Sequence, residues 1–188
     1  YFPKEMEWRT PQDLQAQFEE KRQIGENDSY ICQLIRTDSV KDFIQYVNMT
    51  NFDLSSDINH SQYETNSFLL QKKPTLIEYS AFFGSIKIFK FLQMSKGEIK
   101  ETIWQYAIHG NYPDMIHCLE DLEINADYQS CLFEAIKCHH NDIARYFYNN
   151  YIVSNERLER QIFIEAVRYF NYSYFPDNVR NINSDFVY

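Results

Sequence analysis

Four residues in the last third of the chain carry the thiol and imidazole groups that bind zinc in proteins: Cys131, Cys138, His139 and His140. Structural zinc sites usually place their ligands in close pairs, whereas these cysteines lie seven positions apart and the histidines are adjacent. Adjacent side chains on a helix point about 100° apart, so both histidines would reach one ion only with difficulty. The spacing favours a turn between two helices, and we expect no metal and no other cofactor.

A cysteine beside a histidine could also form a nucleophilic pair, as in Cys138 with His139 or Cys118 with His117. Such a pair needs a deprotonated thiol and a third group that orients the histidine. Neither pair has an obvious third group nearby, and Cys118 falls within an apolar pattern. Phosphate-binding loops are also absent, because no glycine-rich run precedes a helix. We therefore expect a protein that is not an enzyme.

The charge and the apolar content exclude further classes. The 188 residues include 18 basic and 27 acidic side chains, a formal net charge of −9, which disfavours binding to nucleic acid and to anionic lipid. No apolar run reaches the roughly 18 to 20 residues of a membrane helix, so we expect no membrane insertion. Four cysteines without paired spacing are typical of the reducing cytoplasm. Because the sequence begins with Tyr1, we expect a fragment, from which an N-terminal signal could have been lost.

A five-residue pattern recurs four times: two apolar residues, one polar residue and two more apolar residues. On a helix, its four apolar positions form one broad stripe and the middle residue points outward. The copies occupy residues 43–47, 88–92, 115–119 and 143–147. Their first residues lie 45, 27 and 28 positions apart, which is typical of a helical repeat with an insertion in the first interval. We expect that insertion as an irregular segment at residues 49–73, which is rich in Ser, Asn and Asp.

A second helix is expected seven or eight residues before each stripe. Its centre is a small residue in three copies, Ala81, Ala107 and Ala135, which would let neighbouring units approach closely. Gly84 and Gly110 follow the first two of these by three residues, where we expect the chain to reverse. The unit is thus a helix, a tight turn, a helix and a loop. Such a hairpin cannot bury its stripe alone, so the units must stack.

Helix starts are also marked in the sequence. Thr75 with Glu78, and Thr102 with Gln105, match the capping box, in which two side chains satisfy free amides at a helix N-terminus. Near the N-terminus, residues 10–13 predict a helix that begins at Pro11, and Gly25 is expected to end it.

Residues 75–85, Thr-Leu-Ile-Glu-Tyr-Ser-Ala-Phe-Phe-Gly-Ser, resemble the ankyrin signature, a Thr-Pro-Leu-His-Leu-Ala-Ala-x-x-Gly-His run. The stretch from about residue 25 to 150 is similar to a family of protist ankyrin-repeat proteins catalogued as a domain of unknown function, on the blocks 25–32, 76–79 and 136–143. The resemblance implies an all-α solenoid of degenerate ankyrin-type helix-turn-helix repeats. The signature proline is missing and Cys138 replaces a turn glycine, so no β-hairpin is expected in the loops.

Together, the pattern and the resemblance divide the chain into five parts. These are an N-terminal capping helix region at 1–28, a first divergent repeat at 29–48, the irregular insertion at 49–73, central ankyrin-type repeats at 74–155 and an incomplete C-terminal repeat at 156–188.

The resemblance also implies a partner-binding face. In ankyrin arrays, the two variable residues after the paired small residues face the concave side. These positions correspond to Phe82, Phe83, Ile108, His109, Ile136 and Lys137. Apolar groups on an open face would be covered by a partner, or the degenerate repeats could turn them inward against a neighbouring repeat. We expect a protein-protein interaction module with an unidentified protein partner; the alternative is a structural spacer within a longer ankyrin protein.

Overall fold

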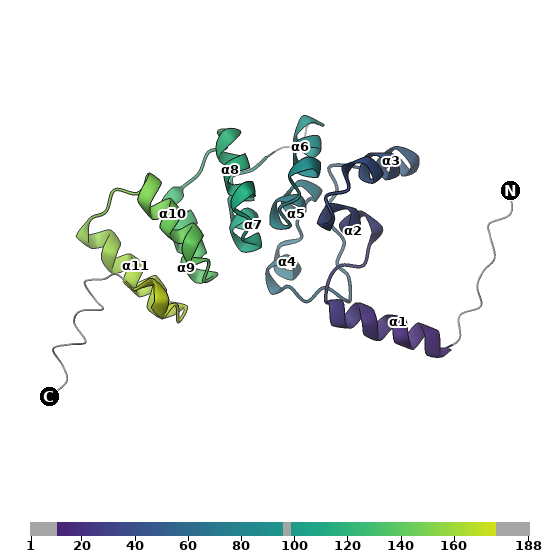
Figure 1. The fold of residues 1–188 in the computed structure, drawn as a ribbon, viewed down its shortest axis with the longest axis horizontal. Helices are drawn as coiled ribbons and strands as arrows, with labels where there is room; N and C mark the ends of the chain where they lie inside the picture. Colours follow the sequence, from purple (N-terminus) through teal and green to yellow (C-terminus); the bar gives the residue numbers. More distant parts are fainter. Residues whose placement is uncertain (1–10, 96–98, 176–188) are drawn as a thin grey trace.

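The computed structural model describes residues 11–95 and 99–175, and in these ranges the protein is all-helical (Figure 1). Apart from one isolated antiparallel bridge between Asp57 and Thr75, the described residues contain no β-structure. The helices, in chain order, are α1 (Pro11–Ile24), α2 (Tyr30–Arg36), α3 (Val40–Thr50), α4 (Ser67–Lys72), α5 (Leu76–Phe82), α6 (Ile86–Met94), α7 (Ile103–Gly110), α8 (Pro113–Asp121), α9 (Tyr128–Lys137), α10 (Asn141–Tyr151), α11 (Glu156–Arg168) and the short 3₁₀ helix η1 (Tyr172–Tyr174).

Most of the helices form consecutive pairs. Helices α2 and α3, α5 and α6, α7 and α8, and α9 and α10 pack against each other within each pair. The first helices also pack in series, α2 on α5, α5 on α7, α7 on α9 and α9 on α11. We call α2, α5, α7, α9 and α11 the inner helices and α3, α6, α8 and α10 the outer helices. In Figure 1 the inner helices lie along the lower side of an arch and the outer helices along its upper side.

The four apolar stripes coincide with the outer helices, as predicted. The first and last residue of each stripe are buried in all four copies. The middle residue is exposed in every copy, at Gln45, Lys90, His117 and Arg145. The stripes face the core because each outer helix covers its inner partner, and large aromatic rings such as Phe43, Phe89 and Phe147 fill the space between helices.

The turns between paired helices share one backbone conformation, but the predicted register of two turns is wrong. Positive φ angles occur at Asp38, Gly84, Asn111 and His139, so Gly110 is the last residue of α7 and Asn111 makes the reversal. The next turn is shifted in the same way, because the reversal falls at His139 and not at Cys138. Gly110 is required for another reason. A Cβ atom at this position would overlap the carbonyl oxygen of Phe82, so α7 approaches α5 through a gap that only glycine leaves open.

One of the two predicted capping boxes forms. The Thr75 hydroxyl accepts from the Glu78 amide, and the Glu78 carboxylate accepts from the Thr75 amide at 2.9 Å. The prediction for Thr102 is wrong, since its backbone is already helical (φ −58°, ψ −18°) and its side chain caps no amide. The first amides of α7 bind carbonyls three residues earlier, and the Thr102 hydroxyl instead donates to Glu78 Oε1 at 3.2 Å.

The chain ends of the array differ from its middle. Helix α1 begins at Pro11 and stops before Gly25, whose φ of +70° ends it, as predicted. After α11 the described chain forms only η1 where the other units have a full outer helix.

The segment before α5 is less irregular than expected. Helix α4 lies inside the range assigned to an irregular insertion, and the Asn66 side chain caps it by accepting from the Phe68 and Leu69 amides. Asn is a strong helix N-cap, but a cap indicates a helix in a sequence only when a helical apolar pattern follows it. Helix α4 has six residues, which are too few to show such a pattern.

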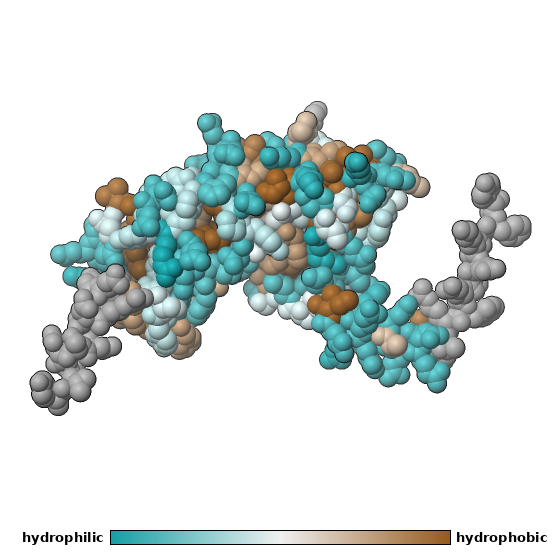
Figure 2. All heavy atoms as spheres, in the orientation of Figure 1, coloured by the Kyte–Doolittle hydropathy of each residue, from teal (hydrophilic) through white to brown (hydrophobic). Residues whose placement is uncertain are grey.

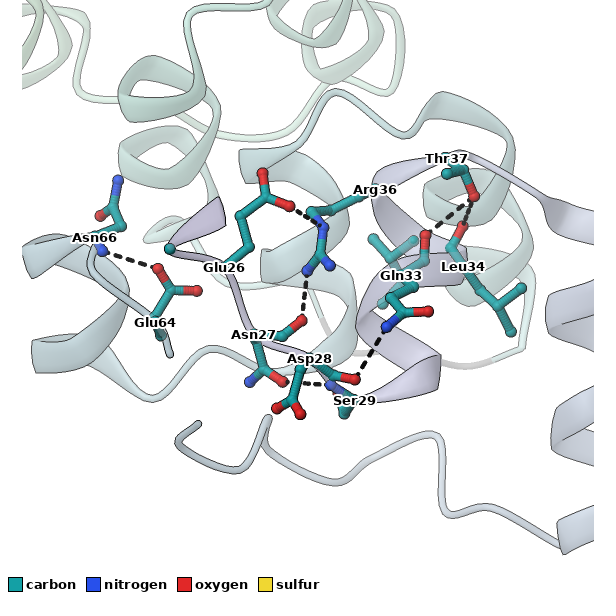
Figure 3. A network of polar contacts seen from close by, with 12 residues as sticks. Glu26, Asn27, Asp28, Ser29, Gln33, Leu34, Arg36, Thr37, Glu64 and Asn66 are labelled. Carbon is teal, nitrogen blue, oxygen red and sulfur yellow. Dashed lines mark hydrogen bonds and ion pairs between the residues drawn. The ribbon is translucent and has the colours of Figure 1, made fainter. Parts of the chain in front are cut away.

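A polar network joins the loop before α2 to the first two pairs (Figure 3). The Arg36 guanidinium contacts Glu26 at 2.7 Å and donates to the Asn27 carbonyl at 2.8 Å. It also donates to the Tyr79 hydroxyl on α5 at 3.0 Å and lies over the Phe83 ring. One side chain therefore fixes this loop and connects α2 with α5.

Neighbouring units are also connected by a hydrogen bond that recurs. The residue after the turn reaches back to a carbonyl of the previous inner helix: Ser85 Oγ donates to Ile35 O at 2.5 Å, His140 Nδ1 to Ile108 O at 2.7 Å and Asn171 Nδ2 to Ile136 O at 2.8 Å. The three acceptors hold equivalent places, three residues before the positive φ position. This bond is a local signature of one repeating unit, built from three different side chains.

Candidate functional site

Three of the six predicted partner-facing residues are buried. Ile108 and Ile136 are fully enclosed, and Phe82 is 8% exposed. Of the two alternatives, an open face or inward packing, the burial of these three residues agrees with inward packing. For Ile108 and Ile136 the cause is the turn register: counted from the positive φ residues, both are equivalent to the buried Ala81.

The other three predicted residues are accessible. Phe83 and His109 are half-buried and Lys137 is exposed, and all three lie at or near the C-terminal ends of inner helices. Whether they contact a partner stays a prediction.

Helix α4 covers part of the face on which Phe82 and His109 were expected. The Phe68 ring stacks on the His109 imidazole, with centroids 3.7 Å apart and planes 14° from parallel. Phe68 also meets Tyr106 edge to face at 5.0 Å and Phe82 at 6.2 Å. The chain thus supplies its own aromatic cover for the C-terminal ends of α5 and α7.

A charged cluster brings together two of the predicted residues. His109 Nε2 lies 2.6 Å from Glu134 Oε1, and Lys137 Nζ lies 2.9 Å from the same oxygen. Burial would raise the pKa of the Glu134 carboxyl, but hydrogen bonds from His109 and Lys137 lower it to about 2. Glu134 is therefore ionised at neutral pH and holds His109 and Lys137 on one side of α9.

The four cysteine and histidine residues considered for zinc in the sequence do not converge on one point. His139 Nε2 contacts the Tyr169 carbonyl at 2.8 Å, His140 contacts the Ile108 carbonyl, and Cys131 is buried on α9. Among the described residues, the group that could surround an ion is a different one, His109, Glu134 and Cys138, with ligand atoms within 4.8 Å of one another.

This group fits a metal poorly. Burial raises the pKa of the Cys138 thiol to about 12, so it is protonated at neutral pH. The Lys137 ammonium already occupies the Glu134 oxygen that faces His109. A divalent cation would have to deprotonate the thiol and displace an ammonium ion from the same carboxylate.

A groove of about 530 Å³, here called the inner groove, runs across the inner helices α7, α9 and α11. Helix α9 forms its floor with Ser130, Phe133 and Lys137, one face of the helix at spacings of three and four. Gln105 from α7 and Tyr169, just after α11, contribute to the two sides. Most of the lining side chains belong to the stacked helices α7, α9 and α11, and the others lie just outside the helix ends.

The inner groove is strongly acidic. Four carboxylates line it, from Glu101, Asp127, Glu134 and Glu165, and among the described residues Lys137 is the only basic side chain in the lining. Glu134 and Glu165 hold equivalent positions in consecutive units, five residues before the positive φ residues His139 and Phe170. This repetition is the signal that sequence reasoning missed, because it appears only when the units are aligned on their turns.

A second hollow of about 640 Å³ lies at the N-terminal ends of α9 and α11. Its wall contains the stacked rings of Tyr128 and Tyr151, 3.9 Å apart, and polar groups including Asp127 and Arg157. Its volume is larger than that of the inner groove, but it lies beside the loop between α10 and α11 and involves only α9 and α11 among the inner helices. The remaining surface seen in Figure 2 is mainly hydrophilic, with apolar side chains in small separate patches.

Residues 95–177 match the model of a family described as a domain of unknown function, DUF3447. The range contains α7 to α11 and so the whole inner groove, and covers less than half of the chain. The matched range shares residues 95–150 with the stretch that resembles protist ankyrin-repeat proteins, and it continues to residue 177. Searches of curated proteins and of solved structures give no match. Within the described ranges, every helix is too short or too polar to span a lipid bilayer.

Proposed function

We propose that this protein is a non-enzymatic protein-protein interaction module, built as a solenoid of degenerate ankyrin-type repeats. The proposal of the repeat class is supported by stacked helix pairs with equivalent turns and by the recurring bond from the residue after the turn to the previous unit. In such arrays each unit contacts its neighbours, and the inner side forms one extended binding surface.

The observation that carries the proposal is the inner groove. It crosses three consecutive inner helices and presents accessible aromatic and charged side chains on a fixed frame. A surface of this kind suits an extended segment of another protein, which could contact α7, α9 and α11 together.

The chemistry of the side chains also supports a role without catalysis. Burial raises the pKa of Cys131 and of Cys138 to about 12, and it raises the pKa of Cys32 and Cys118 as well. Protonated thiols are poor nucleophiles. All four cysteines are free, which agrees with our proposal of a cytoplasmic protein, and the net charge of −9 favours a protein partner over nucleic acid.

The test compares two double variants in affinity capture from the source cell. Q105R with S130R places two cations in the inner groove, and H117R with N149R adds the same charge on the outer helices α8 and α10. We expect the groove variant to lose partners that the wild-type chain and the outer variant retain. Equal capture by all three would refute the inner groove as the interaction surface.

A second candidate function is a structural spacer in a longer ankyrin array, and exposed apolar side chains near the end of α11 favour it. Ile164 and Val167 on α11 and Phe170 just after it are 51%, 41% and 71% exposed, whereas a further repeat would bury them. A spacer predicts that a designed capping repeat fused after α11 raises the melting temperature by several degrees and that groove variants capture every partner. An unchanged melting temperature would count against the spacer.

A further inference from the structure

Three of the four carboxylates of the inner groove have an oxygen that accepts no hydrogen bond from the described residues, whereas both oxygens of Asp127 accept hydrogen bonds. Among the described residues, Glu101 accepts from Asn125 on Oε1, Glu134 accepts from His109 and Lys137 on Oε1, and Glu165 accepts from Arg168 on Oε1. The second oxygen of each of these carboxylates carries no bond within the described part of the chain. None is a buried atom without a partner, so all three reach water and can accept from a ligand.

The aromatic part of the inner groove adds a second requirement. Phe133 on the floor and Tyr169 at the side are half-buried, so each ring keeps part of its surface accessible. Trp104 also lines the groove, and its indole N–H donates to the Asn125 carbonyl at 3.1 Å. A flat cation can stack on such rings while it donates to carboxylates.

The positive charges beside these carboxylates are few and lie at one end. The Lys137 ammonium sits at Glu134, and Arg168 pairs with Glu165 through a guanidinium whose side chain is 58% exposed. Because the Arg168 side chain is largely exposed, water competes for its guanidinium, and a ligand can replace Arg168 at Glu165. The groove therefore keeps a net negative potential, which the charge of −9 on the whole chain reinforces.

We infer that the inner groove recognises an arginine side chain in an extended segment of a partner protein. The guanidinium would stack on Phe133 of α9 and donate to the open carboxylate oxygen of Glu165 on the neighbouring helix α11, while Glu101 on the other side of α9 adds negative charge. Arginine fits better than lysine because its planar fork combines stacking with bidentate donation, whereas an ammonium is a compact and strongly hydrated charge. A volume of about 530 Å³ exceeds one guanidinium and leaves room for the flanking backbone. This inference rests on the proposed interaction function.

The first experiment uses isolated amino-acid amides. Acetyl-arginine amide, acetyl-lysine amide and the neutral isostere acetyl-citrulline amide are titrated into the ¹⁵N-labelled full chain, and chemical shifts are followed. We expect saturable shifts with the arginine compound at the Trp104 indole and at the Gln105 and Phe133 amides, weaker shifts with lysine and none with citrulline. Equal shifts for arginine and citrulline, or arginine shifts spread over the outer helices, would overturn the inference.

Variants test the assignment of charges. Glu165→Gln should weaken arginine binding about two- to fivefold, the effect of one exposed ion pair. The matched control Glu156→Gln removes the same charge from an exposed position on the same helix and should leave the affinity unchanged. Lys137→Gln should strengthen binding because it removes the cation at Glu134. Equal effects of the Glu165 and Glu156 substitutions would show general attraction to an acidic protein and overturn the site.

A selection from a library of random heptapeptides separates failure of this inference from failure of the proposed function. Enrichment of arginine in peptides that shift the groove resonances supports both. Peptides that shift the same resonances without a basic residue overturn the arginine preference and leave the interaction function standing. A library that yields no groove-binding peptide counts against both.

Discussion

Replacing Glu134 by glutamine should remove a pH-dependent contribution to stability. The pKa of this carboxyl is lowered from the ordinary value of 4.5 to about 2, because the bonds from His109 and Lys137 outweigh its burial. The unfolded chain binds the proton more strongly, so the ionised group stabilises the folded state above pH 4.5, and this contribution is lost as the pH falls toward 2. A tenfold change in proton affinity corresponds to about 1.4 kcal/mol of free energy. The shift from 4.5 to about 2 therefore sets an upper limit of about 3 kcal/mol on the contribution of this carboxyl to stability at neutral pH.

The assay is urea unfolding of the wild-type chain and of Glu134→Gln, followed by circular dichroism between pH 7 and pH 3. We expect the variant to be less stable by 2 to 3 kcal/mol at pH 7, with well over half of that difference gone at pH 3, in rough terms. Glu156→Gln is the control, since this side chain is 93% exposed and its substitution should change stability by less than about 0.5 kcal/mol. A difference for Glu134→Gln that stays constant from pH 7 to 3 would refute the reasoning.

Three further substitutions test the contacts between neighbouring units by their effect on the free energy of unfolding. Gly110→Ala should cost about 3 kcal/mol or more, because the new methyl group meets the Phe82 carbonyl, which belongs to a helical backbone and cannot move aside. Asn171→Ala should cost about 1 to 3 kcal/mol, because it removes the bonds that this buried side chain donates to the Ile136 carbonyl and to Asn141 Oδ1. Arg36→Met should cost about 2 kcal/mol, because it removes several charge-assisted bonds and keeps most of the apolar stem. Each value is measured by urea unfolding at pH 7.

Controls for these three variants lie on exposed positions. His117→Ala, Asn149→Ala and Lys90→Met should each stay within about 0.5 kcal/mol of the wild-type chain. If Gly110→Ala or Asn171→Ala falls within the same range, the corresponding contact between units does not stabilise the fold. If Arg36→Met lowers the free energy of unfolding as little as Lys90→Met does, the bonds of Arg36 drawn in Figure 3 do not stabilise the fold.

The helical elements could be predicted because their signals are local. Residues 115–119 carry their apolar stripe in consecutive positions, and the structure buries both ends of it and exposes His117. The capping box of Thr75 and Glu78 formed for the same reason. The capping box at Thr102 does not form because the backbone is already helical before α7 begins. That conformation depends on the path by which residues 99–102 leave the preceding unit.

The site could be predicted only in part, because it depends on contacts between units. A register taken from Gly110 shifted the α7–α8 and α9–α10 units by one residue, and on a helix this moves a side chain by about 100°. Ile108 and Ile136 were therefore assigned to the concave face, and they are buried. Glu101, Glu134 and Glu165 looked like separate solvated charges, and only the stacking of α7, α9 and α11 places them around one groove.

Hydrogen exchange on the complex with a captured partner tests the central claim, that the inner groove is the interaction surface, most directly. Amides of α7, α9 and α11 would be compared with those of the outer helices α8 and α10, with and without the partner. Our proposal predicts that protection increases on the three inner helices and stays unchanged on the outer ones. Protection confined to α8 and α10 would contradict it.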